Sequence, residues 1–415
     1  MTEKMKVAVV GGGAAGFFLS ARLKRLLPEA RVVLFERSSR VLAKVKVSGG
    51  GRCNLTNSFA GVSDLCHVYP RGHKLMKRLL REFSHEDAYR WFETHGVPLT
   101  TQEDECVFPQ SQNSESVILC LKREAESAGV EIRTGCPVQS IERSDNGGLQ
   151  LVFDEGATTS CLFDRVALTT GGAPRGEGHY WLSALGHKIE KPCPSLYTFN
   201  INTPALTSLM GIVVENVSVG IAATKFRAEG ALLITHWGVS GPAILRLSSY
   251  AARYMDEQAY EVPLLINWTG ETNVEKVAQE LRNLLNEAPR RQLGNLHPFG
   301  LQNRLWVYLL ERAGLTSAKP CGELGSKGIN RLVHVLTSDS YAVAGKGAYR
   351  DEFVTCGGVC LESVSMRTLE SKSCPGLYFA GAVLDIDAIT GGFNFQAAWT
   401  TAYVAAEAIA ASLKE

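Results

Sequence analysis

The stretch Lys6-Val7-Ala8-Val9-Val10-Gly11-Gly12-Gly13-Ala14-Ala15-Gly16 decides the fold. Its first five residues form a β-branched run that predicts a short buried strand leading directly into glycines. Helical spacing of apolar residues predicts a helix from Ala14 to Leu27, which Pro28 ends. A second apolar strand is expected from Arg31 to Glu36. This strand-turn-helix-strand order within about 30 residues has the size of a βαβ unit.

The glycine spacing gives this turn a chemical task. Gly11-x-Gly13-x-x-Gly16 follows the strand and opens the helix, and Glu36 ends the next strand. Gly11 permits a tight turn, Gly13 lets the backbone approach a pyrophosphate, and Gly16 allows close packing of the helix on the strand. The helix N-terminus supplies N–H donors, and Glu36 can accept hydrogen bonds from a ribose. The pattern predicts a dinucleotide site and fits FAD and NAD equally well.

The overall charge points to no polyanionic partner. The 415 residues include 43 Lys and Arg against 42 Asp and Glu, which disfavours a nucleic-acid partner, although a local patch can hide inside a neutral total. The longest uncharged apolar run, Val7 to Ala21, is shorter than the roughly 20 residues that span a bilayer, so no membrane partner is expected. We expect a cytoplasmic protein.

The cysteines and histidines show no metal-ligand spacing. The chain has 11 cysteines, and an odd number in a long chain argues against a secreted disulfide framework. The closest pair, Cys356 and Cys360, lies in a predicted strand that holds the two about 13 Å apart, so we expect buried reduced thiols. No metal site is predicted.

The rest of the chain contains two kinds of segment, one typical of an α/β layer and one typical of an inserted domain. Helical spacing runs from Lys74 to His95 and from Asn113 to Ala128, and strands are expected at Val130–Arg133, Leu162–Thr169 and Gly376–Gly381, with an Ala-rich helix at Phe395–Leu413. Between these segments lie short alternating runs at Tyr197–Asn202, Val213–Ile221, Lys225–Glu229 and Ala231–Thr235, followed by charged helical sequence at Val274–Leu315. We therefore predict an α/β fold with a discontinuous Rossmann-like domain, residues 1–192 and 346–415. The inserted domain, residues 193–345, is predicted to be β-rich over 193–265, with a small helical subdomain at about 270–330.

A second glycine cluster carries a specific resemblance. Lys44 to Asn57 reads K-V-K-V-S-G-G-G-R-C-N-L-T-N, similar to the K-x-x-x-S-G-G-G-R-C-N-x-T-N segment of the bacterial flavoprotein family of YhiN/BaiN type. The resemblance continues, in the family's order, at Thr235–Pro242, Gly376–Gly381, Leu384–Asp387 and Thr390–Gln396. It implies an FAD-binding Rossmann-like domain and an NAD(P)/FAD-dependent or aminoacetone oxidase-like oxidoreductase. FAD is then the cofactor, and a small organic molecule exchanges a hydride with it.

The predicted cofactor site combines these segments. Successive glycines remove side chains where a planar ring must lie against backbone, and a helix N-terminus after Gly392 can stabilise negative charge that develops on the ring. The predicted cofactor-binding residues are Gly11, Gly13, Ala14, Ala15, Gly16, Glu36, Arg37, Lys44, Ser48, Gly49, Gly50, Arg52, Cys53, Asn54, Val138, Thr170, Gly171, Gly172, Gly381, Asp387, Gly391, Gly392, Phe393 and Asn394.

The chain departs from the family pattern at several positions. Ala382 stands where the family has Glu, and Asp385 or Asp387 is the candidate replacement for the lost flavin contact. Ala388 replaces a glycine, Glu105–Pro109 replaces G-R-x-F-P, and the loop from Gly171 to His179 is shorter. These departures motivate a second hypothesis, a flavin-binding protein with degenerate or regulatory activity. Distant similarity to flavoproteins that modify tRNA gives a third, a nucleic-acid enzyme.

No residue is assigned as the catalytic acid or base. His236, beside Trp237, is a candidate because histidine titrates near neutrality, with a structural role as the alternative. His179 and His187 are expected to be packing or loop residues. Pro242 replaces the second glycine of G-x-S-x-G and excludes a serine hydrolase. No second G-x-G-x-x-G follows a strand, so NAD(P)H is expected only as a transient reductant.

Overall fold

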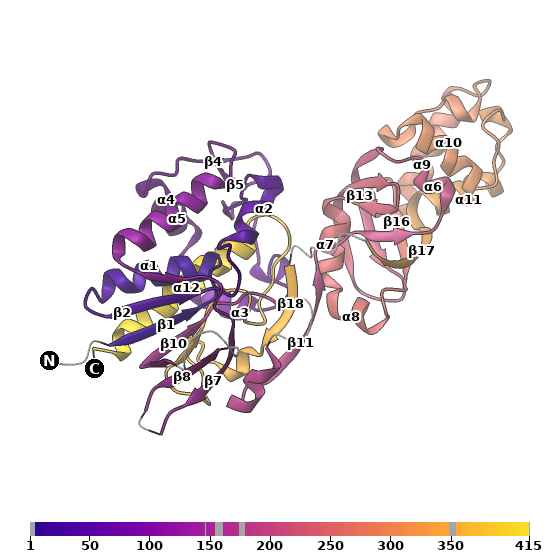
Figure 1. Ribbon diagram of the computed structural model, residues 1–415. Helices are drawn as coiled ribbons and strands as arrows, with labels where there is room; N and C mark the ends of the chain where they lie inside the picture. Colours follow the sequence, from indigo (N-terminus) through magenta and orange to yellow (C-terminus); the bar gives the residue numbers. More distant parts are fainter. Residues whose placement is uncertain (1–4, 146, 154–160, 174–178, 348–353, 415) are drawn as a thin grey trace. The chain divides into compact units, whose positions relative to one another are not determined.

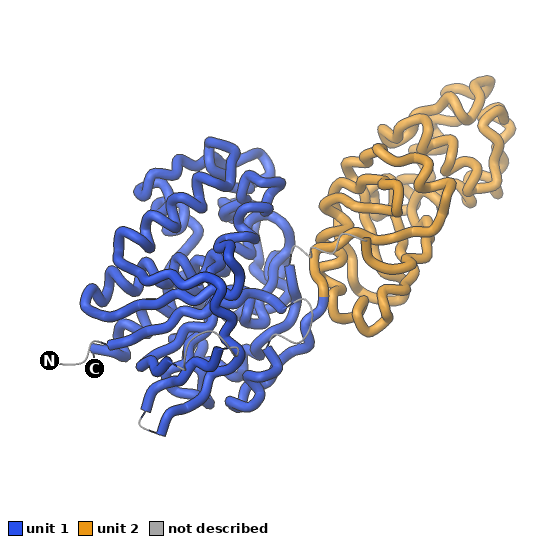
Figure 2. Tube along the Cα trace, viewed as in Figure 1, with its two compact units in different colours: residues 1–193, 354–415 blue, residues 194–353 orange. Residues whose placement is uncertain are grey.

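The computed structural model in Figure 1 describes residues 5–145, 147–153, 161–173, 179–347 and 354–414. The chain divides into two compact units: unit 1 comprises residues 1–193 and 354–415, and unit 2 comprises residues 194–353 (Figure 2). The chain passes between them along β11 (Ile189–Ser195) and β18 (Val354–Val359), which pair with each other. The chain returns to unit 1 after residue 353, further along than the predicted boundary at residue 346. The reason is that β17 (Asp339–Lys346) still belongs to the barrel of unit 2.

A five-stranded sheet forms the core of unit 1, in the order β19-β10-β1-β2-β6, and all its paired strands are parallel. The strands are β1 (Lys6–Val10), β2 (Arg31–Phe35), β6 (Glu131–Arg133), β10 (Arg165–Leu168) and β19 (Leu377–Phe379). The central strands are continuous apolar runs because layers cover both faces of the sheet. The predicted Rossmann-like α/β fold is confirmed, and β19 brings the C-terminal segment into the sheet.

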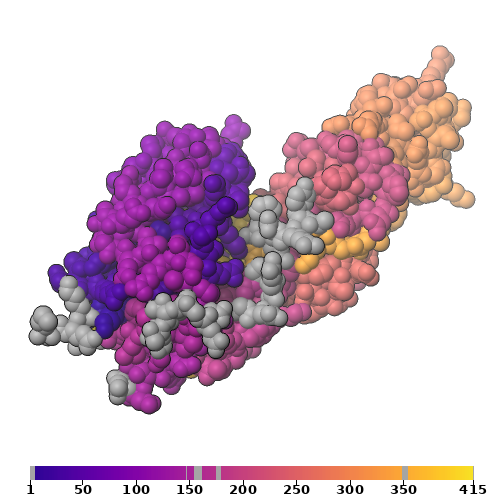
Figure 3. Space-filling model, viewed as in Figure 1, coloured from indigo at the N-terminus to yellow at the C-terminus, as the bar shows by residue number. Residues whose placement is uncertain are grey.

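Helices pack on one face of this sheet and a small antiparallel sheet on the other (Figure 1). The helices are α1 (Ala14–Leu26), α5 (Glu115–Ala128) and α12 (Phe393–Ser412), with α1 in the middle. The opposite sheet contains β7 (Val138–Arg143), β8 (Leu149–Phe153) and β9 (Cys161–Phe163), and the Phe153 and Phe163 rings lie 5.2 and 5.8 Å from the Phe35 ring. Most of α12 is buried, and on the face shown in Figure 3 little of the yellow C-terminal segment reaches the surface.

A second layer of unit 1 lies around the N-terminal half of α12. It contains α2 (Ala43–Gly51), α3 (His73–Leu79), α4 (His85–Thr94) and a sheet of β3 (Thr56–Asn57), β5 (Cys106–Pro109) and β4 (Leu99–Thr101). The uninterrupted helical spacing predicted from Lys74 to His95 is wrong. Ser84 Oγ accepts from Asp87 N at 3.2 Å and Asp87 Oδ2 accepts from Ser84 N at 2.9 Å, so a capping box starts a new helix.

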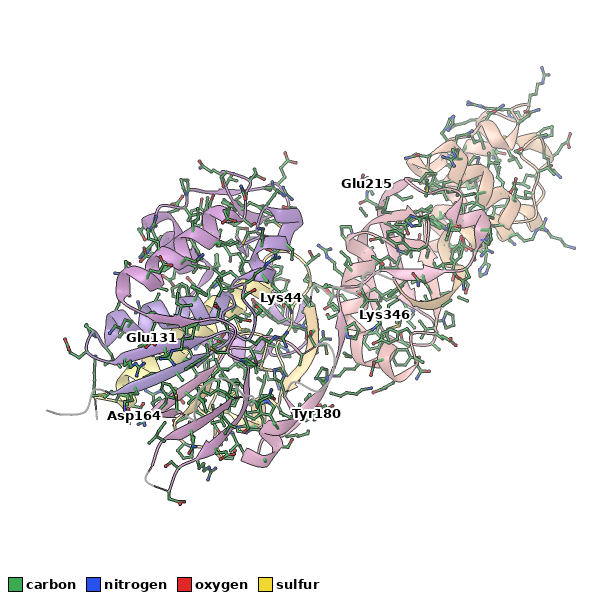
Figure 4. All side chains as sticks on the ribbon, viewed as in Figure 1. Lys44, Glu131, Asp164, Tyr180, Glu215 and Lys346 are labelled. Atoms are coloured by element: carbon green, nitrogen blue, oxygen red, sulfur yellow. The ribbon has the colours of Figure 1, made fainter. Side chains whose placement is uncertain are left out.

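The single strand predicted from Leu162 to Thr169 is also wrong. The structure divides it into β9, which pairs with β8, and β10, which pairs with β1. Asp164 separates them, and its Oδ2 accepts from Lys6 N at 2.6 Å (Figure 4). A continuous apolar run cannot reveal a change of strand partner, because both strands bury apolar side chains.

Unit 2 is a closed six-stranded barrel with helices attached. The barrel contains β12 (Phe199–Ile201), β13 (Val213–Ile221), β14 (Arg227–Thr235), β15 (Gly238–Ser240), β16 (Pro263–Asn267) and β17. The helices are α6 (Pro204–Thr207), α7 (Pro242–Tyr250), α8 (Ala252–Glu257), α9 (Val274–Glu287), α10 (Asn303–Arg312) and α11 (Ser326–Ser338). Two strands were expected where β14 is one. Gly230 continues the strand opposite Val217, next to a bulge between Val214 and Val217.

A buried carboxylate ties the helices of unit 2 to its barrel. The Asp339 side chain is 1% exposed and forms an ion pair with Arg312 of α10, whose Nε lies 3.1 Å from Oδ1. Asp339 Oδ2 accepts hydrogen bonds from Trp268 Nε1 at 3.1 Å and Tyr341 OH at 2.5 Å. Pairing and hydrogen bonding offset the cost of burying this charge. Within the described ranges, no helix is long and apolar enough to cross a membrane.

Candidate functional site

The turn between β1 and α1 is closely packed at two glycines and open at the third. Gly11 has φ 117°, and a Cβ atom there would lie 2.5 Å from Thr169 O. A Cβ on Gly16 would lie 1.9 Å from Gly11 O. For Gly13, the N-cap residue of α1, no atom of the described part of the chain lies within 4 Å of the position of a Cβ. A ligand can therefore approach the N–H groups at the start of α1 only because Gly13 has no side chain there.

Glu36 is held beside this turn. Its Oε2 accepts from Gly12 N at 2.8 Å, and its Oε1 accepts from Ser38 N at 2.9 Å. Its carbonyl oxygen accepts from Cys136 N at 2.9 Å, which places the start of β7 and Val138 near the same end of the sheet. Oε1 also accepts from Ser38 Oγ at 3.0 Å. The carboxylate is fixed where a ribose of a dinucleotide would lie, and Oε2, with one donor, can accept from a hydroxyl as well. Arg37 is exposed at this end of the sheet.

The second glycine stretch ends α2. The helical backbone is lost at Ser48, and Gly49, Gly50 and Gly51 follow with φ of 56°, 69° and 86°. Three successive left-handed residues are favourable only for glycine. Among the described residues, nothing lies within 4 Å of a Cβ built on Gly50 or Gly51, so these two glycines present bare backbone.

The C-terminal glycine turn lies directly against this stretch. The Asn54 side chain bridges the two segments, because its oxygen can accept from Gly392 N at 3.2 Å while its nitrogen donates to Thr56 O at 3.0 Å. Asn57 Nδ2 donates to Gly391 O at 3.0 Å. A Cβ on Gly392 would lie 2.1 Å from Thr56 O. Segments more than 300 residues apart in the chain therefore converge, and the N-terminus of α12 begins where they meet.

The end of β19 reaches the first glycine turn. Gly381 N donates to Thr401 Oγ1 at 2.8 Å, and a Cβ on Gly381 would lie 3.0 Å from the Cβ of Ala15. Ala14 and Ala15, the first residues of α1, therefore lie beside the C-terminal end of β19. All three glycine-lined segments belong to unit 1.

Two predicted cofactor residues have other partners. Asp387 is 0% exposed and forms an ion pair with Arg71, whose Nε lies 2.5 Å from Oδ1. Asn394 Oδ1 accepts from Ala388 N, and its Nδ2 donates to Ala388 O, both at 3.0 Å. These side chains fix the loop that precedes the glycine turn. The carboxylate of Asp387 is paired with Arg71, and its contact with a flavin in place of the family glutamate stays a prediction.

The remaining predicted residues of the second glycine stretch are packed around it. Arg52 Nε donates to Gly49 O at 3.1 Å, and its guanidinium lies 4.2 Å from the centre of the Phe108 ring. Cys53 is buried, and burial raises the pKa of its thiol to about 12, so it is protonated at neutral pH. Phe393 O accepts from Tyr69 OH at 2.8 Å. Lys44 lies exposed on α2 (Figure 4).

The side chains of Thr170 and His179 form a hydrogen bond across the loop after β10, which the structure describes only at its two ends. Thr170 Oγ1 lies 3.1 Å from His179 Nε2. Gly171 between them has φ 73° and open space at its Cβ position, whereas a Cβ on Gly172 would lie 2.5 Å from that of Thr355. His179 is buried, as expected for a packing residue, and burial lowers the pKa of its imidazole to about 4.

Replacing His179 with glutamine is expected to reduce the decrease in the free energy of unfolding between pH 7 and pH 4. The folded pKa of about 4 lies below the ordinary 6.5, so the unfolded chain binds this proton first. Stability from the neutral imidazole is present above pH 6.5 and falls as the pH drops towards 4, by up to about 3 kcal/mol. Denaturant unfolding from pH 7 to 4 measures it. Burial also lowers the pKa of His187, so the wild-type-minus-variant difference is the relevant quantity, and parallel pH profiles would contradict the assignment.

Two other candidates from the sequence lie outside this cluster. His236 is exposed between β14 and β15 of unit 2, with its ring 4.4 Å from that of Trp237, and its acid-base role stays a prediction. Cys356 and Cys360 are both free buried thiols. Cys356 hydrogen-bonds to Cys193 on the neighbouring strand β11 instead.

The sequence missed several residues that hold the site together. Thr56 and Asn57 lay inside the quoted glycine-rich block, so their polar side chains were visible signals beside the glycines. Tyr69 and Arg71 fall in a stretch with no motif, and only the fold brings them to Phe393 and Asp387. No sequence signal identifies such a pairing in a single chain.

The residues present fit a dinucleotide that carries a planar ring system. Bare glycine backbone borders open space at Gly13, Gly50, Gly51 and Gly171. The N-termini of α1 and α12 provide N–H donors and positive helix-dipole ends for a pyrophosphate and for an electron-rich ring edge. Glu36 provides the ribose acceptor. The donor set is that expected for FAD at the carboxyl ends of a parallel sheet.

Comparisons with known proteins agree with this assignment. A family model described as "HI0933-like protein Rossmann domain" matches residues 5–408. The chain is similar to the ribosomal RNA dihydrouridine synthase of Escherichia coli (strain K12), with 31% identity over 425 residues and 99% of each chain covered. It is similar to the 3-dehydro-bile acid delta(4,6)-reductase of Clostridium scindens, with 25% identity over 413 residues, covering 98% of this chain and 99% of the relative. The ribosomal RNA dihydrouridine synthase of Haemophilus influenzae is 27% identical over 417 residues, with 99% of each covered.

Solved structures resemble the fold. A 3-ketosteroid delta1-dehydrogenase from Sterolibacterium denitrificans superposes with a TM-score of 0.53 at 14% identity, covering 99% of this chain and 100% of that one. A 3-ketosteroid-delta4-(5alpha)-dehydrogenase from Rhodococcus jostii gives a TM-score of 0.50 at 16% identity, covering 98% of each chain. At such low sequence identities, the structural similarity supports the fold and says nothing about the activity.

Proposed function

Because the chain belongs to the HI0933-like family, we propose that it is an FAD-dependent oxidoreductase that reduces a carbon–carbon double bond conjugated with a carbonyl group. The observation that carries the proposal is the meeting of three glycine-lined segments at one edge of the parallel sheet. Bare backbone, two helix N-termini and an acceptor for a ribose lie together there. FAD requires this combination, and a purely structural turn does not.

The substrate chemistry comes from what the names of the three relatives share. Dihydrouridine is uridine with two hydrogens added across a ring double bond conjugated with a carbonyl. A delta(4,6)-reductase of a 3-dehydro bile acid likewise acts on double bonds of a ketone-bearing ring. Hydride addition to such a bond places negative charge on the carbonyl oxygen, which favours a site with positive helix-dipole ends.

The residues of this chain divide the work of holding the cofactor. Gly13 would admit a pyrophosphate to the α1 N-terminus, Glu36 would accept from a ribose, and Gly50 and Gly51 would leave room for a planar ring. The bound flavin would supply the hydride chemistry. The N-terminus of α12 would stabilise negative charge at the ring edge beside Gly392. Ala382 supplies no carboxylate near the ribityl chain, so Glu36 and backbone N–H groups carry the polar contacts.

A second candidate places the double bond in an RNA base. The two ribosomal RNA dihydrouridine synthases match this chain over 99% of its length and of theirs. A small-molecule substrate remains the alternative, through the bile acid reductase. The near-neutral total charge does not separate the two, because RNA contacts depend on local charge.

Anaerobic titration tests the proposed reaction. We expect NADH or NADPH to bleach the visible flavin absorbance, although no second Rossmann motif binds the nucleotide permanently. Addition of a 3-keto-Δ4 steroid or a uridine-containing RNA should then restore the absorbance, and mass spectrometry should show two hydrogens added to the acceptor. A flavin that dithionite bleaches but neither nucleotide reduces, and that no acceptor reoxidises, would favour the degenerate flavin-binding protein suggested by Ala382.

A further inference from the structure

Helix α3 presents a row of cations on one exposed face. Lys74, Lys77, Arg78 and Arg81, here called the basic stripe, follow the spacing i, i+3, i+4 and i+7, which puts them on the same side of a helix. Arg81 lies in the turn that follows the C-cap residue, where its N–H donates to Arg78 O at 3.2 Å. The apolar residues of α3, Leu75, Met76 and Leu79, point the other way and are buried.

The charge of the stripe is largely uncompensated. Within the described part of the chain, none of its four side chains forms an ion pair or has a hydrogen bond to a carboxylate. Asp64 lies near enough to Lys77 for each to affect the other electrostatically, and Glu82 is the single acid between residues 72 and 84. A protein with balanced total charge therefore carries a local positive field at this helix.

The stripe is anchored to the predicted cofactor segment. Gly72, the N-cap residue of α3, would clash with Ile386 if it carried a Cβ, at 2.7 Å. The preceding residue, Arg71, is paired with Asp387, and Ile389 N donates to Val68 O at 2.9 Å. These contacts connect the residues before α3 with residues 386–389, which lead into the turn at Gly391 and Gly392. A polyanion lying on the stripe is therefore held next to the segment that we assign to FAD.

We propose that the basic stripe binds the phosphate backbone of an RNA and thereby presents a base to the site. Cations at helical spacing, roughly 5–6 Å between neighbouring Cβ atoms, suit a chain of phosphates better than a single small anion. A membrane surface fits less well, because α3 offers no exposed apolar side for insertion. The choice of RNA over DNA rests on the second candidate of the proposed function, in which the double bond to be reduced belongs to an RNA base.

Salt-dependent RNA binding tests this surface. The stripe variant carries K74Q, K77Q, R78Q and R81Q. The matched control neutralises four exposed cations of unit 2 with R290Q, R291Q, K327Q and R331Q, so the change in net charge is the same. A fluorescently labelled, uridine-containing RNA hairpin is titrated into each holoprotein between about 50 and 200 mM salt.

The expected result is a selective change in the stripe variant. If all four cations contact phosphates, the slope of log affinity against log salt becomes shallower by about 3, and low-salt affinity falls at least about tenfold. The control should keep the wild-type slope. Equal slopes for wild type and the stripe variant would overturn the proposal, as would stripe-dependent binding to phosphatidylglycerol vesicles without binding to the hairpin.

The outcome stays separable from that of the proposed function. Circular dichroism and FAD content of the stripe variant should equal those of the wild type, because its four side chains are exposed and none belongs to the predicted cofactor-binding residues. NAD(P)H reduction and reoxidation by the free steroid should also be unchanged. A wild-type protein that binds the hairpin through the stripe but never exchanges electrons with a nucleotide or acceptor would sustain the RNA surface and reject the oxidoreductase.

Discussion

Replacing Gly13 with valine is expected to abolish FAD binding and leave the fold intact. Gly13 has φ −91° and ψ −167°, a conformation that any residue adopts, and no atom of the residues that the structure describes lies within 4 Å of its Cβ position. The valine side chain would instead occupy the approach to the α1 N-terminus. Loss of the pyrophosphate contacts, about 3 kcal/mol or more, corresponds to at least about a 100-fold increase in Kd. Titration of the apoprotein with FAD, followed by flavin fluorescence, measures it.

A second glycine provides a matched control. Gly325 is the N-cap residue of α11 in unit 2, has φ −71° and ψ 167°, and also has no atom within 4 Å of its Cβ position. Gly325→Val should therefore reproduce any general effect of valine at a helix N-cap while FAD affinity stays at the wild-type value. Wild-type FAD affinity in Gly13→Val, or an equal loss in both variants, would show that the first turn does not bind the pyrophosphate.

Replacing Arg71 with methionine is expected to destabilise unit 1 strongly and weaken FAD binding. The side chains of Arg71 and Asp387 are 11% and 0% exposed, so the substitution leaves a buried carboxylate without its guanidinium. Breaking a buried pair in this way costs about 3–5 kcal/mol. The loop from Ile386 to Gly391 loses its anchor as well, so FAD affinity should fall together with the free energy of unfolding. Denaturant unfolding and FAD titration on the same protein give both quantities.

An exposed ion pair of unit 1 provides the control for the loss of stability expected in Arg71→Met. Arg31 Nη2 lies 2.8 Å from Glu131 Oε2, with side chains that are 48% and 40% exposed. Arg31→Met should cost less than about 1 kcal/mol, because solvent screens such pairs. If Arg71→Met and Arg31→Met lowered stability equally, or if FAD affinity were unchanged in Arg71→Met, the proposed anchoring of the glycine turn would be wrong.

Elements with a regular local pattern could be predicted from the sequence. The β1 run, the glycine turn and α1 follow from β-branched residues, Gly11 to Gly16 and the stop at Pro28. The end at Leu26 and the start of α12 at Phe393 agree with the expected helices to within about two residues, the usual uncertainty of helix ends. These features depend on neighbours in the chain, and the sequence contains them in full.

Features that depend on distant partners could not be predicted. The division between β9 and β10 is a choice of strand partner, and the capping box at Ser84 competes with helical spacing on both sides of it. Asp387 was a candidate replacement for the family glutamate, and no sequence signal indicated that Arg71 reaches it from a segment 316 positions away. The basic stripe was hidden in the total charge, because charge balance sums over the whole surface.

The most direct test of the account is the amount of FAD bound by the wild-type protein. One adenine-flavin cofactor should occupy each chain, visible as a yellow colour that survives gel filtration and is released as intact FAD on denaturation. A purified protein that is colourless, and stays colourless after incubation with excess FAD, would contradict the claim that distant glycine segments build one cofactor site.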